Sequence, residues 1–295
     1  MKVLVIGRSG QVARALISKA DRDTRIVALG RPDVDFERPD TLVAALNAHA
    51  PDVVASVGAY TAVDQAEKEP DIAERTNAIG PGALARACAE RGIPIVHLST
   101  DYVFDGAKTG AYVEDDATNP TGVYGRTKLA GERAVAGSGA RHAILRAAWV
   151  FDAEGKNFLR TMLRLAKTRE RIGVVADQRG CPTYADHLAD VVVEVARKLE
   201  KGEGNSGVYH VAGGSACSWR DFAVAILEGS TRRGGPSAAV EPLTTADYPT
   251  LAKRPANSVL DCGKLARDYQ LSLPPWQSGM EACLAEIEIG GWRVD

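Results

Sequence analysis

The chain has few cysteines, and they form no pattern typical of a metal site or a disulfide framework. Its 295 residues include five cysteines, an odd number, and no two of them are spaced as CxxC. No spacing of His, Cys, Asp and Glu in the sequence resembles a zinc site. We therefore expect free thiols in a reducing compartment and no bound metal.

The sequence also lacks long apolar runs and an excess of charge of one sign. No run is long enough to span a membrane, and the apolar run at residues 3–6 is too short for a signal peptide. The formal net charge of −2 gives no reason to expect nucleic acid or an anionic membrane as the main partner. We therefore expect a cytoplasmic protein with neither of these partners.

What is present in the first half of the chain is an alternation of short apolar runs with helical patterns. The apolar runs, expected to be strands buried on both faces, are residues 3–6, 26–29, 53–57, 93–98 and 143–145. The helical patterns between them are residues 11–20, 39–50, 72–91 and 124–136. This order predicts an α/β fold with a Rossmann-type, doubly wound parallel sheet.

Beyond residue 150 the pattern is less regular and predicts a smaller C-terminal α/β lobe. Helices are expected at residues 157–168, 185–200 and 218–228, with Ser218 as an N-cap, and a short strand at 208–211. We predict that residues 1–150 form an NAD(P)-binding domain, to which parts of the later chain return. Residues 151–295 are then expected to form mainly the substrate lobe.

A glycine-rich turn follows the first expected strand and opens the first expected helix. Its spacing, from Gly7 to Ala13, is G-x-x-G-x-x-A. Gly7 permits a tight turn, Gly10 lets the backbone approach a pyrophosphate, and a small residue at position 13 lets the helix pack closely. Free N–H groups at the helix N-terminus can bind the phosphates. The position favours a dinucleotide-binding loop over an ordinary strand–turn–helix.

The second expected strand has no carboxylate at its end to bind the ribose 2′-hydroxyl of NAD. Gly30-Arg31 stands there instead, and Arg31 or Arg8 could pair with a 2′-phosphate. Asp33 and Asp35 lie close by in the sequence and make the distinction between NADPH and NADH less clear. The alternative for Arg31 is a solvated surface arginine. We favour NADPH as the cofactor and leave NADH open as a second one.

Two segments carry groups suited to proton transfer. Ser99-Thr100 stands at the end of an expected buried strand, where open α/β sheets bind ligands. Tyr124 and Lys128 are four residues apart on an expected helix and therefore share a face. Tyrosine normally titrates near pH ~10, and we expect the nearby ammonium to lower the Tyr124 pKa.

Together these motifs resemble those of the extended short-chain dehydrogenase/reductase superfamily. Within it, the chain is similar to the family of dTDP-4-dehydrorhamnose reductases over nearly its whole length. The run Ser-Thr-Asp-Tyr-Val-Phe at residues 99–104 is far more specific than the glycine loop. The other matching runs are residues 7–12, 61–67, 123–132, 149–150, 157–158, 177–178, 182–183, 254–255 and 257–258.

The resemblance implies NAD(P)H-dependent reduction of the C4 ketone of dTDP-4-dehydro-L-rhamnose to dTDP-L-rhamnose, the last step of dTDP-rhamnose synthesis. Tyr124 would donate the proton to the ketone oxygen. Lys128 would support Tyr124 and bind the nicotinamide ribose. Thr100 would hydrogen-bond the ketone oxygen and polarise the carbonyl.

The resemblance also implies two binding sets. The cofactor set is Gly7, Arg8, Ser9, Gly10, Gln11, Val12, Arg31, Asp35, Phe36, Gly58, Ala59, Tyr60, Tyr124 and Lys128. The set for the nucleotide sugar is Val63, Thr100, Asp101, Tyr102, Trp149, Asn157 and Arg254. A core tryptophan remains an alternative for Trp149, and a surface salt bridge for Arg254.

Two positions depart from the family pattern. The loop after the third expected strand has Ser56 where the family commonly has asparagine. Some members dimerise through a magnesium site that uses a glutamate of the first helix, and Ala15 stands at that position here. We therefore expect no such metal site, and a monomer or a weak homodimer.

Two other functions stay open from the sequence. One is a reductase or epimerase of another nucleotide-linked deoxysugar. The other is a non-catalytic regulatory subunit, similar to that of some methionine adenosyltransferases. The complete set of Thr100, Tyr124 and Lys128 favours catalysis.

Overall fold

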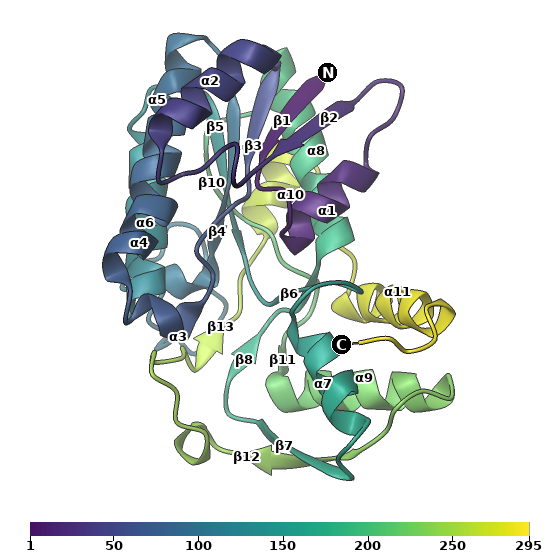
Figure 1. Cartoon of the computed structure of the whole chain (residues 1–295). Helices are drawn as coiled ribbons and strands as arrows, with labels where there is room; N and C mark the ends of the chain where they lie inside the picture. The colour runs from purple at the N-terminus through teal and green to yellow at the C-terminus, as the bar shows by residue number, and fades with distance from the viewer. Residues whose placement is uncertain (295) are drawn as a thin grey trace.

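A six-stranded parallel sheet forms the larger part of the computed structural model, which describes residues 1–294 (Figure 1). Its strands, in spatial order, are β10 (Gly207–His210), β5 (His142–Ala147), β4 (Ile95–Thr100), β3 (Val53–Ser56), β1 (Lys2–Ile6) and β2 (Arg25–Leu29). All neighbouring strands pair in parallel. The order of connection reverses between β1 and β3, which opens a crevice at the carboxyl ends of the strands. The predicted doubly wound sheet is confirmed.

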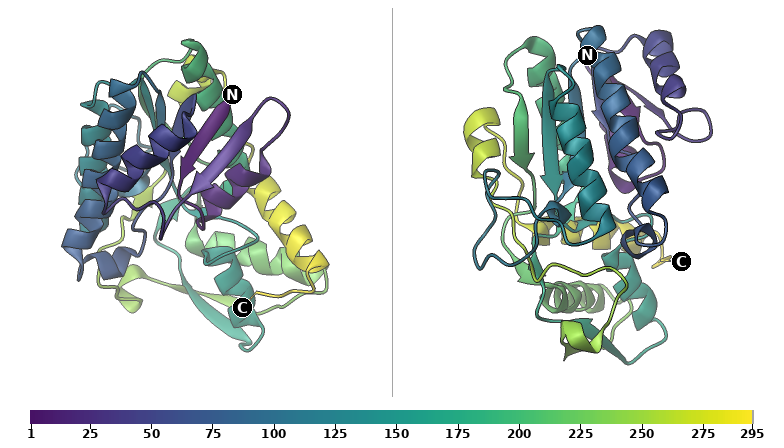
Figure 2. Two further views of the ribbon diagram at one scale, coloured as in Figure 1. Left: turned by 45° about the horizontal axis from the view of Figure 1, so that its top comes forward. Right: turned by 90° about the vertical axis from the view of Figure 1, so that its left-hand side faces the viewer.

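Helices cover both faces of this sheet (Figures 1 and 2). One face packs on α1 (Gln11–Ser18) and α8 (Ala185–Lys201), and the other on α2 (Pro39–His49), α5 (Gly80–Glu90) and α6 (Val123–Ala136). Val3 and Val5 belong to the first core, whereas Leu4 and Ile6 belong to the second. Because both faces are buried, the strand sequence is a continuous apolar run. A short helix, α10 (Gly263–Tyr269), packs beside β10.

The expectation of burial on both faces is wrong for β2. Its residues are half-buried or exposed, because β2 is the edge strand and has a neighbour on one side only. Edge strands of parallel sheets receive less cover than central ones, so an apolar run alone does not distinguish the two.

The helix expected at residues 72–91 is interrupted. The chain forms α4 (Pro70–Glu74), one π-helical turn (Arg75–Ile79) and then α5. Pro81 has no N–H to donate to the Asn77 carbonyl four residues earlier. That carbonyl instead faces Gly131 of α6, where an added Cβ would overlap its oxygen. The widened turn therefore brings Asn77 against the helix that carries Tyr124 and Lys128.

A smaller α/β lobe lies at the carboxyl ends of the sheet strands, at the bottom of Figure 1. Its strands are β6 (Val150–Phe151), β7 (Arg171–Val175), β8 (Arg179–Gly180), β9 (Thr183–Tyr184), β11 (Cys217–Ser218), β12 (Ala239–Leu243) and β13 (Asn257–Ser258). Its helices are α7 (Phe158–Ala166), α9 (Trp219–Arg232) and α11 (Trp276–Ile289). Its core is rich in aromatic residues, with Phe151, Phe222 and Trp276 in contact.

Polar side chains cap the N-termini of two helices in this lobe. Ser218 is the N-cap of α9, as predicted, and forms a capping box with Asp221. Asn157 is the N-cap of α7 rather than its first helical residue, and its side chain accepts a hydrogen bond from the Arg160 N–H.

All five cysteines are unpaired. No helix within residues 1–294 combines the length and the apolar character needed to cross a bilayer.

Candidate active site

A cavity of about 560 Å³ lies at the carboxyl ends of the sheet strands, between the sheet and the smaller lobe. It brings together the following predicted residues: Ser9, Gly10, Gln11, Val12, Ala59, Val63, Thr100, Asp101, Tyr102, Tyr124, Lys128 and Trp149. Other predicted residues do not line it: Gly7, Arg8, Arg31, Asp35, Phe36, Gly58, Tyr60, Asn157 and Arg254. Members of both predicted sets therefore meet in one cavity, and the other members lie outside its lining.

The glycine loop has the shape that a pyrophosphate requires. Gly7 has a φ of 128°, and a Cβ there would lie 2.8 Å from the Gly58 nitrogen, so only glycine fits. Nothing lies within 4 Å of a Cβ added at Gly10, which leaves open space in front of the α1 N-terminus. No side chain caps that terminus, so its N–H groups are available to an anion. These features fit a dinucleotide.

Two arginines stand at the end of β2. Arg8 donates to the Arg31 carbonyl oxygen at 3.2 Å, and both side chains are exposed. The Asp33 carboxylate lies 3.8 Å from the Arg8 guanidinium. The side chain of Asp35 accepts a hydrogen bond from the Glu37 N–H at 3.1 Å and so stabilises the turn in which it lies. This rim offers two guanidinium groups to a phosphate.

The predicted residues behind the glycine loop are packed rather than exposed to the cavity. Phe36 is buried against Gly58 and Gly80, where added Cβ atoms would meet its ring or backbone. The Tyr60 hydroxyl donates to Glu69 at 2.5 Å, and this bond is the largest cause of the raised pKa of Tyr60, about 12. In this structure Phe36 and Tyr60 support the loop.

Thr100 and Tyr124 form the centre of the cavity. Thr100 is the last residue of β4, and Tyr124 is the second residue of α6. Both side chains line the cavity. Burial raises the Tyr124 pKa well above its ordinary value, and the neighbouring Thr100 hydroxyl offsets only part of the rise. The phenol therefore stays protonated at neutral pH and is a proton donor.

Lys128 lies one helical turn after Tyr124, and its effect on the tyrosine differs from the prediction. Its ammonium, 3% exposed, donates to the Leu98 carbonyl oxygen at 2.6 Å. The expectation that it lowers the Tyr124 pKa is wrong, because burial dominates and Lys128 is turned toward Leu98. Burial also lowers the pKa of Lys128 itself to about 8.

A buried ion pair behind these residues was not foreseen from the sequence. The Glu132 carboxylate accepts from Arg146 Nε at 2.9 Å and from Arg146 Nη2 at 2.7 Å. Ser99 Oγ donates to the same carboxylate at 2.5 Å. Glu132 lies one turn after Lys128, so the 124–128–132 spacing was a signal that this position shares the face of the catalytic pair.

Asn77 is a second residue that sequence reasoning missed. It is fully buried in the π-helical turn, and its side-chain oxygen accepts from the Tyr60 N–H at 2.8 Å. Its amide nitrogen donates to the Tyr60 carbonyl oxygen at 3.2 Å and to Thr127 Oγ1 at 3.1 Å. Asn77 therefore joins the loop after β3 to the helix that carries Tyr124. The sequence signal is only the Gly80-Pro81 pair that follows.

The far wall of the cavity is aromatic. Trp149, at a φ of 49°, stacks on Trp219 with centroids 3.5 Å apart, and both line the cavity. Gly180 lies against the Trp149 ring, where a Cβ would overlap it. The Tyr102 ring meets Tyr124 edge-on at 5.5 Å. Trp219 is a further residue that sequence reasoning missed, since it lies seventy positions away.

Arg254 and Asn157 occupy other places than the centre of the cavity. Arg254 Nη2 lies 2.5 Å from Asp64 Oδ2, an ion pair that the sequence left open as an alternative. The Asn157 amide donates to Gln11 Oε1 at 3.0 Å and so connects α7 with the start of α1. Asn157 thus ties the smaller lobe to the phosphate-binding end of the sheet.

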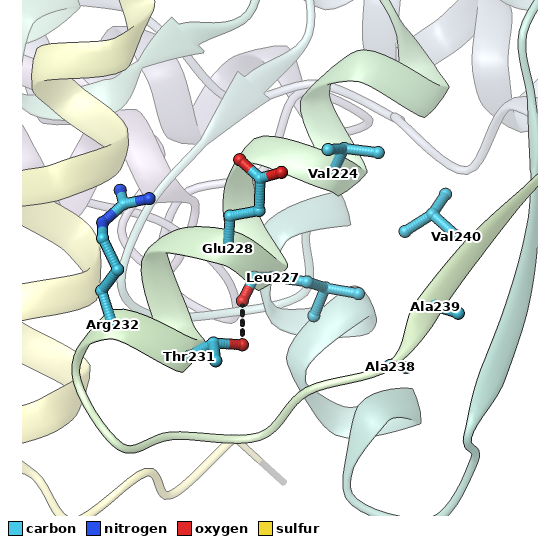
Figure 3. A pocket seen from close by; sticks show the side chains of 8 residues that line it. All are labelled: Val224, Leu227, Glu228, Thr231, Arg232, Ala238, Ala239 and Val240. Atoms are coloured by element: carbon cyan, nitrogen blue, oxygen red, sulfur yellow. Dashed lines mark hydrogen bonds between the residues drawn. The ribbon is translucent and has the colours of Figure 1, made fainter.

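A second hollow, of about 490 Å³, lies on the outer side of the smaller lobe between α9 and β12 (Figure 3). Val224, Leu227 and Val240 lie on its sides, and the Thr231 hydroxyl donates to the Leu227 carbonyl oxygen. None of the residues that line it belongs to the predicted sets. No group of three or more His, Cys, Asp and Glu side chains within residues 1–294 is placed to hold a metal ion.

Comparison with known proteins gives close relatives over nearly the full length. The family model described as the RmlD substrate binding domain matches residues 1–289. The chain is 45% identical to a dTDP-4-dehydrorhamnose reductase of Sinorhizobium fredii over 94% of both chains. A solved dTDP-4-dehydrorhamnose reductase of Clostridium acetobutylicum is 35% identical, with a TM-score of 0.90 over 98% of this chain and 100% of the other. The same enzyme of Bacillus anthracis, solved in complex with NADP, is 32% identical, with a TM-score of 0.90 over 97% and 99%.

Replacement of Asn77 by alanine should destabilise the protein, because three buried hydrogen bonds lose their partner. We expect Asn77→Ala to lower the free energy of unfolding by about 1–3 kcal/mol. The control Asn47→Ala, at an exposed position of α2, should change it by less than about 0.5 kcal/mol. Denaturant titration measures both. Equal effects of the two substitutions would contradict the role given to Asn77.

Proposed function

The chain belongs to the RmlD substrate binding domain family, and from this we infer that it reduces the C4 ketone of dTDP-4-dehydro-L-rhamnose to dTDP-L-rhamnose with NADPH. It is an oxidoreductase of the dTDP-rhamnose pathway. The observation that carries the proposal is the meeting of Thr100, Tyr124 and Lys128 in one cavity beside the glycine loop. The relatives reported above, which are 32–45% identical, are named as reductases and not as epimerases or regulatory subunits.

The chemistry of these three side chains fits a ketone reduction. NADPH, when bound, supplies the hydride. Tyr124 donates a proton to the ketone oxygen, and its raised pKa keeps that proton in place until the oxygen becomes basic. Thr100 donates a hydrogen bond to the same oxygen. The Lys128 ammonium, which donates to the Leu98 carbonyl oxygen in this structure, would hold the nicotinamide ribose.

The predicted cofactor-binding residues can be assigned to parts of the dinucleotide. The N–H groups at Gly10, Gln11 and Val12 would hold the pyrophosphate at the start of α1. Arg8 and Arg31 would hold the 2′-phosphate, and Arg8 would then exchange Asp33 for it. Ser9, Ala59 and Gly58 would border the cofactor, and Phe36 and Tyr60 would support that border.

The nucleotide sugar would lie against the aromatic wall. Val63, Asp101 and Tyr102 would surround the sugar, and Trp149 would pack on it from the smaller lobe. Arg254 would bind the diphosphate. To do so, its guanidinium would have to leave the Asp64 carboxylate with which it is paired in this structure. Asn157 would act from the junction with α1.

The remaining assignments concern the whole chain. We propose that residues 1–150, with α8 and β10 from the later chain, bind the cofactor, and that residues 151–295 bind mainly the nucleotide sugar. We also propose a cytoplasmic location. The five unpaired cysteines support it, because thiols stay reduced in that compartment. The proposed assembly is a monomer or a weak homodimer without metal.

Replacement of Tyr124 by phenylalanine should abolish most of the activity, because the proton donor is lost. We expect kcat for NADPH oxidation with dTDP-4-dehydro-L-rhamnose to fall by about 10²–10⁴-fold. Tyr248→Phe, at an exposed tyrosine, is the matched control and should keep the wild-type rate. A fully active Tyr124→Phe, or a well-folded wild type that oxidises no NADPH, would refute the proposal.

Replacement of Arg31 by alanine should weaken the preference for NADPH. Loss of one guanidinium beside the 2′-phosphate should lower kcat/KM for NADPH by about tenfold. The value for NADH should change by less than about twofold, since NADH lacks that phosphate. Arg22→Ala, at an exposed residue before β2, serves as the control. Parallel loss with both cofactors would count against this use of Arg31.

A further inference from the structure

The Thr100 hydroxyl has a single proton and more than one acceptor. Thr100 Oγ1 donates to Asp101 Oδ1 at 2.9 Å and accepts from the Tyr102 N–H at 3.2 Å. A hydroxyl has one donor only, so a proton given to Asp101 is not available to a ketone oxygen. The direction of the Thr100–Asp101 hydrogen bond therefore decides whether Thr100 can polarise the substrate.

Asp101 is placed so that both of its protonation states are accessible. Its side chain is 3% exposed, and its Oδ2 atom is buried without a partner of hydrogen-bond geometry within residues 1–294. Burial raises the pKa of Asp101 to about 6, although Ser258 and Thr100 stabilise the charged form. A carboxylic acid at this place can donate to Thr100, whereas a carboxylate can only accept.

The other ionisable groups around Asp101 come from several segments. They are Tyr102 on its own segment, Tyr124 on α6, Cys181 after β8, and the Arg254–Asp64 pair, which acts on Tyr102. Burial raises the pKa of both tyrosines and of the cysteine, so these three stay neutral below pH ~8. Asp101 is therefore the group beside Thr100 that changes charge near pH 6.

We propose that Asp101 sets the direction in which Thr100 donates: the protonated carboxyl donates to Thr100 Oγ1 and frees the Thr100 hydroxyl for the ketone oxygen, whereas the carboxylate takes that hydroxyl proton. This rests on the proposed reduction of a ketone at Tyr124. Asp101 acts through Thr100 and is in this respect a positioning residue. The proton that it gains comes from solvent, and no covalent step is involved.

The dependence of kcat/KM for the ketone on pH tests the proposal at saturating NADPH, since this parameter then reports the ionisations of the enzyme–NADPH complex before the ketone binds. The kcat/KM of wild type should fall by about tenfold as pH rises through about 6. A loss of this size is expected when one hydrogen bond to the ketone oxygen is lost. A second fall near pH 8 comes from Lys128. In Asp101→Asn the amide donates to Thr100 at every pH, so the fall near 6 should disappear and the fall near 8 should remain.

Asp105→Asn is the matched control, because Asp105 is on the same segment but bonds to Tyr112 and Asn119 away from Thr100. It should keep both falls. An Asp101→Asn variant that keeps the fall near pH 6 would overturn the proposal. A wild type without that fall, together with a variant slowed equally at all pH values, would overturn it too.

A measurement that needs no activity separates this proposal from the proposed function. The infrared difference between wild type and Asp101→Asn should contain a carboxylic-acid band at about pH 5 that is lost as pH rises through about 6. Absence of the band would refute the titration of Asp101. An enzyme inactive on the ketone that still shows the band would refute the proposed function and, because no ketone reduction remains, the role of Thr100 with it.

Discussion

The buried ion pair between Glu132 and Arg146 is the contact on which the geometry of the site depends. Both side chains are 4% exposed, and the carboxylate also accepts from Ser99. Burial of two charges is costly unless their hydrogen bonds are satisfied, and here two Arg146 donors and one hydroxyl converge on one carboxylate. The pair joins β4, β5 and α6, so Thr100, Tyr124 and Lys128 are carried by elements fixed to one another.

The parts of the fold that follow from local pattern were predictable, and those set by neighbours were not. Strands buried on both faces read as apolar runs, which located β1, β3, β4 and β5. The same pattern gave no sign that β2 is an edge, because position in a sheet is a tertiary property. Helix α11 is not among the helices expected from the sequence, although Trp276, Met280 and Cys283 are spaced as a buried helical stripe. Prolines directly before it, at 274 and 275, are typical of loops and obscure where the helix begins.

The candidate site shows the same division. The glycine loop and the Tyr124/Lys128 pair lie within single segments, so spacing alone indicated them. The residues that were missed contact partners between 14 and 70 positions away in the sequence: Asn77, Trp219 and the Glu132–Arg146 pair. The sequence around each of them does not indicate which residue its partner is. The direction of the pKa shift of Tyr124 was also beyond the sequence, because it depends on how deeply the cavity buries the ring.

A double-mutant cycle on Glu132 and Arg146 tests the central claim most directly. Glu132→Gln and Arg146→Met should each cost about 3–5 kcal/mol of unfolding free energy and lower kcat, because each leaves a buried group without its partner. The double variant should recover part of the stability, with a coupling energy of about 1 kcal/mol or more. Additive losses of stability, or single variants that keep the wild-type kcat, would show that the pair does not hold the site together.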